Sequence, residues 1–234
     1  MNKKVLEIKN QKLNKLCDKL TIIFSNDMLF RVSSVLAAVF WMIAIVHAAS
    51  NIRNLAYIMQ MILMIICIGF NYFAYRNREN SLCKSLIGAL LGVHICDILY
   101  FLSDHYFEYG LDMESWVLIA QLISAVMLFA NHFKMMAEHN SNKNTVFFSQ
   151  ALIIVKSLIT IVDYALCLTA PFGAYGLNIG LLFDGLGCIA SYILVVCVEA
   201  RLDSYRIIRE SAEAEGIWTE EMKEETKQKV FGKK

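Results

Sequence analysis

The sequence predicts an all-α integral membrane protein, a polytopic bundle of six transmembrane helices with both termini in the cytoplasm. The 234-residue chain is 57% hydrophobic and 18% charged, and its mean hydropathy of +0.50 is too high for a soluble domain of this size. Six apolar runs are each long enough to cross a hydrocarbon layer of about 30 Å, which takes about 20 helical residues. Lysine and arginine gather in alternate connections between these runs.

Residues 1–29 precede the first run and form a basic, amphipathic segment that we expect on the cytoplasmic side. Apolar residues recur there at helical spacing, opposite Lys12, Lys15 and Lys19: they are Leu13, Leu16, Cys17, Leu20, Ile23 and Phe24. This pattern is typical of a helix that lies on an anionic membrane surface. It equally fits a basic lead-in that only fixes the orientation of the first span. The segment is too polar for a cleavable signal peptide, so we expect the first span to be an uncleaved anchor.

Each apolar run must be helical, because a backbone inside lipid can satisfy its amides only within the segment. The predicted spans cover residues 30–49, 55–75, 84–104, 115–137, 146–168 and 175–198. The single proline, Pro171, falls between the fifth and sixth spans, where a residue that breaks helices is expected.

The orientation follows from the positive charges. Besides the lysines of the N-terminal segment, one set of alternate connections carries Arg31, Arg76, Arg78, Lys84, Lys134, Lys143, Arg201, Arg206 and Arg209. The other set holds only Arg53, with no lysine or arginine in residues 105–115 or 169–175. The positive-inside rule therefore places both termini in the cytoplasm. We expect the plasma membrane as the location.

The fifth span contains a lysine and an aspartate in an otherwise apolar run. At about 3.6 residues per turn, one face of this helix carries Thr145, Ser149, Lys156, Thr160, Asp163 and Cys167. A charge in lipid costs about 2.5 to 3.5 kcal/mol on insertion scales, so this face must point into the bundle or a watery cavity. Lys156 and Asp163 are two turns apart, roughly 10.5 Å, which is too far for an unstrained direct pair. We therefore predict that Lys156 pairs with Asp97 or Asp184 on another helix.

Other spans also have polar faces, on which Gln60, Asp97, Gln121 and Asp184 fall at a depth similar to that of Asp163, with Lys156 and His94 nearer the cytoplasmic side. These faces carry Gln60, Cys67 and Asn71 in the second span, His94, Asp97, Tyr100 and Asp104 in the third, Gln121, Ser124 and Asn131 in the fourth, and Gly180, Asp184, Gly187 and Ser191 in the sixth. We predict one substrate-binding or proton-binding site that contains Lys156, Asp163, Asp97, Asp184, His94, Gln60, Gln121 and Thr160. The alternative is an ion pair that only fixes the register of the helices.

The histidines argue against an intramembrane metalloenzyme. His47, His94 and His132 fall near the outer end, the middle and the inner end of their spans, so they cannot ligate one ion at about 2.0 to 2.1 Å. A retinal-type Schiff base at Lys156 would find carboxylate counter-ions, but the expected seventh helix is missing. The sequence has no glycine-rich phosphate loop and no Cys-x-x-Cys pair, so we expect no metal, no cofactor and free thiols.

Residues 199–234 form a charge-mixed tail, which we expect to be a cytoplasmic helix with solvated faces and an interruption at Gly216. The tail is too short to be a kinase, cyclase or DNA-binding domain of its own, so we expect no nucleic-acid partner. The chain then divides into the N-terminal segment 1–29, the six-helix membrane domain 30–198 and this tail. A sensor built this way would need a partner protein to carry its signal.

Two functions fit these observations. No motif identifies a reaction, so the sequence favours a protein that is not an enzyme without deciding the question. The first is a small permease or transport subunit, in which three carboxylates against one lysine favour a small cationic or hydrogen-bonding solute, or protons. Its six spans could form three plus three inverted halves, with Asp97 and Asp184 in the third helix of each half. The second is a non-catalytic sensor or scaffold that signals through a cytoplasmic or membrane partner. The lipid bilayer is the partner common to both.

Overall fold

The chain folds into a bundle of long helices. The computed structural model describes residues 15–50, 55–78, 82–138, 143–169 and 179–231. Residues 15–24 are helical, and the chain then forms α2 (Asp27–Ser50), α3 (Leu55–Arg76), α4 (Leu82–Tyr109), α5 (Met113–Glu138), α6 (Lys143–Thr169), α7 (Ile179–Ala214) and α8 (Glu220–Phe231). Within these ranges there is no strand, and the six helices α2 to α7 are long and apolar enough to cross a membrane. The all-α class is confirmed, and so is the prediction of six helices long and apolar enough to cross a membrane.

The outward faces of the bundle are apolar, as lipid contact requires. Large hydrophobic side chains are exposed along these faces, among them Val32, Val35, Val39, Ile62, Ile65, Ile154, Leu158 and Ile161. So much exposed hydrocarbon would be unfavourable in water. The polar residues of the spans instead lie mostly inside, so the helices are oriented by the cost of placing polar groups in lipid.

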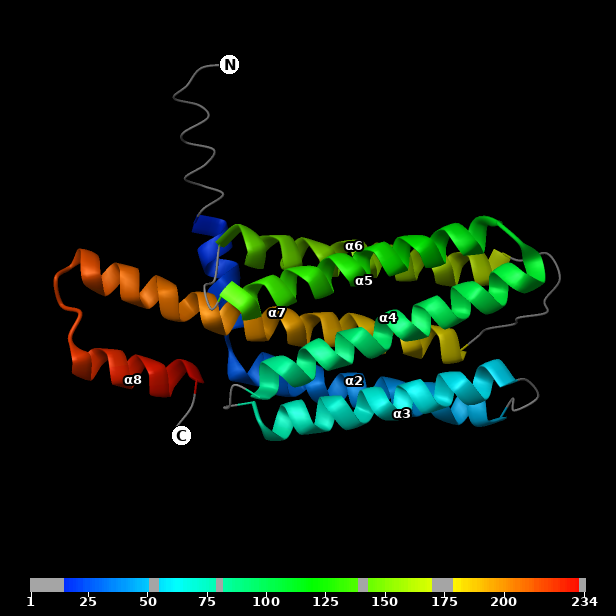
Figure 1. Ribbon diagram of the computed structural model, residues 1–234, viewed down its shortest axis with the longest axis horizontal. Helices are drawn as coiled ribbons and strands as arrows, with labels where there is room; N and C mark the ends of the chain where they lie inside the picture. Colours follow the sequence, from blue (N-terminus) through cyan, green and yellow to red (C-terminus); the bar gives the residue numbers. More distant parts are fainter. Residues whose placement is uncertain (1–14, 51–54, 79–81, 139–142, 170–178, 232–234) are drawn as a thin grey trace, which may run out of the picture.

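Helix α7 occupies the centre of the bundle. The helices contact one another in chain order from α2 to α7, and α7 closes the ring by packing against α2 while also contacting α4 and α5 (Figure 1). In the most apolar 18-residue stretch of α7, 61% is buried inside the bundle. In the corresponding stretches of the other five helices the buried share is 28 to 39%. Small residues permit the close approach of α2 and α7, because a Cβ at Gly187 would lie only 2.5 Å from Nε1 of Trp41.

The sixth predicted span ends at residue 198, and α7 continues beyond it as one helix to Ala214. Its 36 residues correspond to about 54 Å at about 1.5 Å per residue, well beyond the thickness of a hydrocarbon layer. A turn then leads into α8. It contains Gly216, with φ of 68°, and is the interruption that the sequence predicts at this residue. The Tyr205 and Trp218 rings meet edge to face, 6.3 Å apart, across this turn. Residues 15–24 and α8 lie at the same end of the bundle, called here the α8 end (Figure 1).

A cluster of arginines around one aspartate ties three helices together at the α8 end. Asp27 accepts hydrogen bonds from Arg31 Nε at 2.5 Å and from an Arg201 NH2 group at 2.9 Å. Arg78 Nε lies 3.5 Å from the same carboxylate. The Arg201 guanidinium also stacks 4.8 Å from the centre of the Phe30 ring. These contacts fix the start of α2 against the end of α3 and the middle of α7.

Candidate functional site

Lys156 is buried in the bundle and bonded to a neutral amide. Its Nζ donates to Gln121 Oε1 at 2.6 Å, and Gln121 Nε2 donates to Asp163 Oδ2 at 2.7 Å. Lys156 is 1% exposed, and Gln121 and Asp163 are also buried. An amide can do this because one end accepts a hydrogen bond and the other donates. One side chain from α5 therefore links the two charged groups of α6.

The partner predicted for Lys156 is corrected by this geometry. We expected a direct ion pair with Asp97 or Asp184, but Nζ bonds to Gln121 instead. The charge of Lys156 nevertheless acts electrostatically on Asp97, Asp163 and Asp184. Opposite charges at matching depth in the sequence identify these carboxylates. They do not identify Gln121, a neutral side chain that bonds to both Lys156 and Asp163.

The other two carboxylates come from α4 and α7. Asp97 is buried, and its Oδ1 receives no hydrogen bond from the described residues. It interacts electrostatically with Asp184, which also interacts with Asp163. Gln60 on α3 is buried beside Asp184 and within its hydrogen-bonding reach. Together with α6, the four helices α3, α4, α5 and α7 thus contribute polar groups to one region of the bundle.

Thr160 completes the part of the predicted set that gathers around Lys156. It is buried on α6 one turn from Lys156, and its Oγ1 has no hydrogen-bond partner in the described part of the chain. Its methyl group packs against α7, where a Cβ at Gly185 would lie 2.5 Å from Thr160 Cγ2. An unbonded hydroxyl in this position leaves a free donor and acceptor near the three carboxylates.

His94 lies in a neighbouring polar contact between α4, α7 and α2. Its Nε2 lies 3.0 Å from Ser191 Oγ, its Nδ1 lies 3.5 Å from Cys188 Sγ, and its ring stacks 5.3 Å from that of Trp41. Ser191 Oγ donates to the Cys188 carbonyl at 2.7 Å, so it must accept from His94 Nε2. His94 feels the charge of Lys156 but does not bond to it. Of the residues predicted for the site, His94 is the one whose contacts with Ser191 and Cys188 place it beside the group around Lys156 and not within it.

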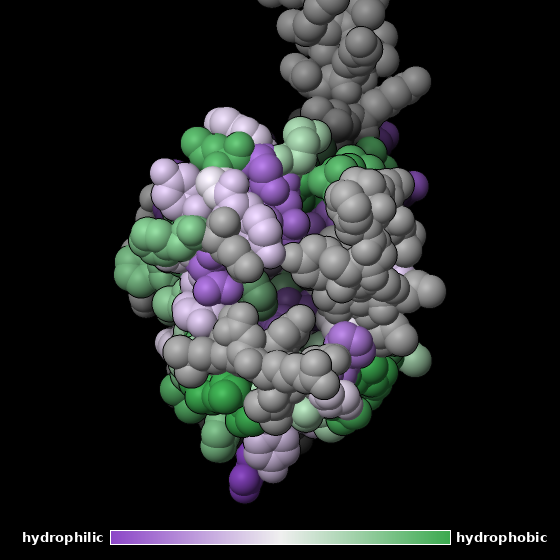
Figure 2. Space-filling view, turned by 90° about the vertical axis from the view of Figure 1, so that its right-hand side faces the viewer, coloured by the Kyte–Doolittle hydropathy of each residue, from purple (hydrophilic) through white to green (hydrophobic). Residues whose placement is uncertain are grey.

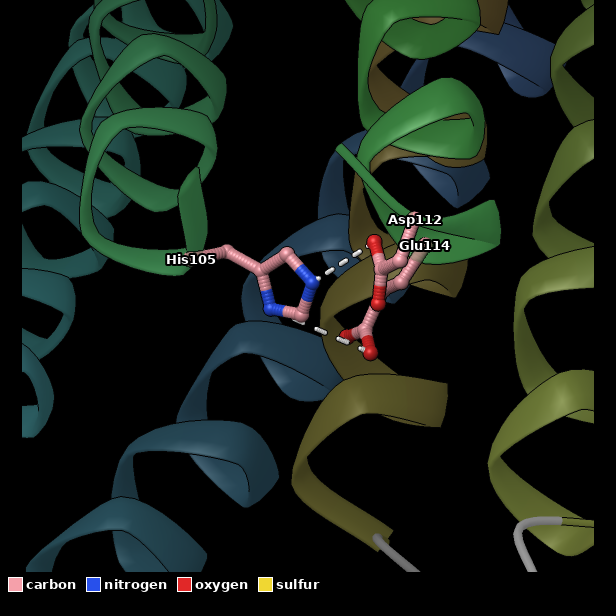
Figure 3. Close-up of side chains that lie close together, drawn as sticks. All are labelled: His105, Asp112 and Glu114. Atoms are coloured by element: carbon pink, nitrogen blue, oxygen red, sulfur yellow. Dashed lines mark hydrogen bonds and ion pairs between the residues drawn. The ribbon is translucent and has the colours of Figure 1, made fainter. Parts of the chain in front are cut away.

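A second cluster lies where α4 ends and α5 begins, called here the turn end. The His105 ring from α4 points toward Asp112 and Glu114 (Figure 3), with Nε2 2.9 Å from Asp112 Oδ1 and Nδ1 4.0 Å from Glu114 Oε2. Asp112 caps α5, because Oδ1 also accepts from the Ser115 amide at 2.8 Å. Ser115 Oγ lies 2.9 Å from both Asp112 Oδ1 and the Gly110 carbonyl oxygen, and its single hydrogen can be donated to either. Glu114 in turn interacts electrostatically with Asp163 of the buried site. In the sequence these residues stand out only by the lack of positive charge around them, and no spacing there predicts that they cluster.

These three side chains are also the group that could offer ligands to a metal ion within the described residues. One ligand atom from each lies within 4.8 Å of the others. Two features disfavour a cation there: Asp112 Oδ1 already accepts from the Ser115 amide and lies 2.9 Å from His105 Nε2, and the start of a helix carries partial positive charge. Although the slight burial of Asp112 acts to raise its pKa, the hydrogen bonds from Ser115 and His105 outweigh it and lower the pKa of this carboxyl.

The described cysteines are free thiols: Cys17, Cys67, Cys83, Cys96, Cys188 and Cys197. Two of the tail's acidic residues depart from expectation, because Glu199 and Asp203 are fully buried rather than solvated. They lie on the part of α7 that the ends of neighbouring helices cover. Hydropathy could not reveal this, since it does not distinguish a charge covered by protein from one covered by water.

No protein-family model, curated protein or solved structure matches the chain. What the site can do therefore follows from its own groups. It combines a buried ammonium, three carboxylates, two amides and a hydroxyl. Such a set can bind a proton, a small cation or a solute with several hydrogen-bonding groups.

Proposed function

We propose that the chain is a small permease or transport subunit of the plasma membrane, with both termini in the cytoplasm. Its buried site would accept a small cationic or hydrogen-bonding solute, or protons. The observation that supports this proposal is the Lys156, Gln121 and Asp163 chain of hydrogen bonds, set beside the carboxylates of Asp97 and Asp184. Ionisable groups inside a membrane most often mark the path of a substrate or proton.

The charge balance of the site favours a positive ligand. If every group were ionised, the Lys156 ammonium and three carboxylates would sum to +1 − 3 = −2. An excess negative charge in a weakly polar interior is costly, so a cation or protons must compensate it. A solute amine or protons on the carboxyl groups would both restore neutrality. We expect Asp163 to exchange protons first and Asp184 second.

A route toward the turn end supports the same proposal. From Lys156 the polar groups continue through Gln121 and Asp163, and Asp163 interacts with Glu114 beside the exposed Asp112. Figure 2 views this end of the bundle and shows hydrophilic surface near its centre, with hydrophobic surface toward the rim. We take this end as external, because its connections carry one positive charge, Arg53, whereas the connections at the other end carry many.

The neighbour relations of the helices are compatible with two inverted halves, α2 to α4 and α5 to α7. In such an arrangement the contact of α2 with α7 corresponds to that of α4 with α5, and α4 meets α7 across the middle. Asp97 and Asp184 then belong to the third helix of each half. One contact, between α5 and α7, has no counterpart between α2 and α4.

The test is transport by purified protein in liposomes. A thermal-stability screen against amines, amino acids and vitamins first finds a ligand, because binding to the folded state raises its melting temperature. Internal pH and solute uptake are then followed for the wild type and for Asp97→Asn, Asp163→Asn and Asp184→Asn. We expect at least one variant to fold normally yet uncouple solute movement from the proton gradient. Four indistinguishable traces would refute proton coupling, and no uptake of any bound solute would refute transport.

A sensor or scaffold remains the second candidate, favoured by the continuity of α7. This single helix carries Asp184 inside the bundle and runs without a break to Ala214, where α8 packs back against it. A change at the site could therefore reach the α8 end through a rigid element. Hydrogen exchange at α8 with and without the screened ligand tests this candidate. Ligand-dependent exchange at α8 together with no transport would favour it, and unchanged exchange would oppose it.

A further inference from the structure

Glu199 is a fully buried carboxylate of α7 whose closest charged partner is a histidine. Its Oε1 lies 3.5 Å from His132 Nδ1 on α5, and both residues are buried near the α8 end. Neither carboxylate oxygen receives a hydrogen bond of normal geometry from the described residues. Ser149 on α6 is the other polar group that faces Glu199.

The hydrogen bonds of His132 determine where its hydrogens are. Nε2 lies 3.0 Å from the backbone carbonyl oxygen of Lys84, which can only accept, so Nε2 carries a hydrogen. Without a further proton, the lone pair of Nδ1 would then face the negative Glu199 oxygen directly. Two arrangements avoid this repulsion: a proton on Nδ1, giving an imidazolium beside a carboxylate, or a proton on Glu199. Each contains one proton more than the repulsive state.

Within the described part of the chain, the nearby acid and arginine of α7 have other partners than Glu199. Asp203, the other fully buried acid of α7, is bonded to Arg206 Nε at 2.6 Å. Arg201 is directed to Asp27 of α2, 2.9 Å away. Arginine stays charged at any physiological pH, whereas histidine gains and loses a proton near neutrality. Asp203 thus has a permanent cation beside it, whereas the basic group beside Glu199 is an imidazole.

We infer that His132 and Glu199 form a second proton-binding site, which holds one proton between the two residues at the α8 end. This site is separate from the one around Lys156. That this pair binds a proton does not depend on the proposed function. That it serves as the cytoplasmic proton-binding site of a transport pathway does rest on the proposed function. Release of that proton leaves a neutral imidazole and a carboxylate, the repulsive state that favours uptake of the next proton.

The polar face of α6 links the two sites. Ser149, which faces Glu199, precedes Lys156 by seven residues, or roughly 10.5 Å along the helix axis. Asn131 of α5 donates to Ser149 Oγ at 2.6 Å and to the Thr145 carbonyl at 2.8 Å, which fixes the hydroxyl at this place. The stripe read from the sequence therefore leads from the site around Lys156 to the buried acid of α7.

The experiment is solid-state NMR on full-length protein in lipid bilayers, with isotope-labelled histidine rings and glutamate carboxyl groups, at neutral pH. The His132 signal is identified by its proximity to the Lys84 carbonyl carbon, so the wild type decides the question even if a variant does not fold. We expect either an imidazolium at His132 or a protonated carboxyl at Glu199. A neutral His132 beside an ionised Glu199 would overturn the inference.

Two variants sharpen the result. Glu199→Gln should leave His132 neutral with its hydrogen on Nε2, and the matched control Asp203→Asn should leave the His132 signal as in the wild type. An imidazolium that persists in Glu199→Gln would also overturn the inference. These readings need no transport. Bound proton without uptake in liposomes would refute only the proposed function, and uptake with an unprotonated pair would refute only this inference.

Discussion

Lys156 and Asp163 are joined across two turns of α6 by an amide that belongs to another helix. The Gln121 side chain accepts from the lysine at 2.6 Å and donates to the aspartate at 2.7 Å. The amide dipole is thereby aligned with both charges, and each stabilises the bond that the other makes. The arrangement holds α5 to α6 at two points through one residue. It also keeps two opposite charges from neutralising each other directly.

The first prediction concerns this bridge. Gln121→Leu removes one hydrogen bond to the buried Lys156 and one to the buried Asp163, and should lower the free energy of unfolding by about 3 kcal/mol or more, since each hydrogen bond to a charged group contributes about 1.5 to 3 kcal/mol. Adding Lys156→Met should recover part of that loss, since the uncompensated ammonium is then gone. Equilibrium unfolding in detergent measures both, and strictly additive losses would contradict the bridge.

Gln150 provides the matched control for that cycle. It is a buried glutamine on α6, but neither of its amide atoms has a hydrogen-bond partner in the described structure. Gln150→Leu should therefore leave the free energy of unfolding unchanged or raise it, because no bond is lost and an unsatisfied amide is removed. A loss as large as that of Gln121→Leu would mean that glutamine volume, and not the bridge, decides the result.

The second prediction concerns the contact between α2 and α7. A Cβ at Gly187 would lie 2.5 Å from Nε1 and 2.7 Å from Cδ1 of Trp41, so Gly187→Ala should force the two helices apart and destabilise the fold by about 1 to 3 kcal/mol. Gly92→Ala on α4 is the control, because nothing lies within 4 Å of its added methyl group. Thermal unfolding should show a lower melting temperature for the first variant alone. Equal melting temperatures would argue against close packing at Gly187.

The third prediction fixes the orientation in the membrane. Leu111 at the turn end and Ile217 beyond α7 are both exposed, at 63% and 49%. In a cysteine-free background, Leu111→Cys should react with an impermeant maleimide on intact cells, and Ile217→Cys only after lysis. The reverse pattern would place the termini outside and the turn end inside.

The fourth prediction concerns the start of α5. Hydrogen bonds from Ser115 and His105 lower the pKa of Asp112, so the folded state binds this proton more weakly than the unfolded chain does. The cap is therefore fully present above the ordinary carboxyl pKa of about 4 and is lost as the pH falls through the lower folded value. Hydrogen exchange of the Ser115 amide, corrected for intrinsic rates, should accelerate in that acid range. Asp112→Asn keeps a capping oxygen and should remove this pH dependence, and an unaltered profile would count against the cap.

The sequence sufficed for the features that lipid imposes. The cost of polar groups in hydrocarbon dictates both the six spans and the inward direction of the α6 stripe, so both could be read from residue spacing. The sequence was insufficient where a side chain is buried by other parts of the protein. Glu199 looked like the first residue of a solvated tail, since a charged side chain alone does not show whether helix ends surround it. Likewise, the role of Gln121 depends on two distances that no spacing within α6 encodes.

The enclosure of α7 has a consequence for how the chain is made. The last of the six spans in sequence order is also the one with the least contact with lipid, and it pairs with the first span, α2. The open row of helices α2 to α6 must therefore enter the membrane with the place of α7 vacant, and lipid or a membrane chaperone has to cover it until α7 arrives. Assembly is then completed by a single late insertion, and any delay in translation before residue 179 prolongs the interval in which an unfinished bundle is exposed to degradation.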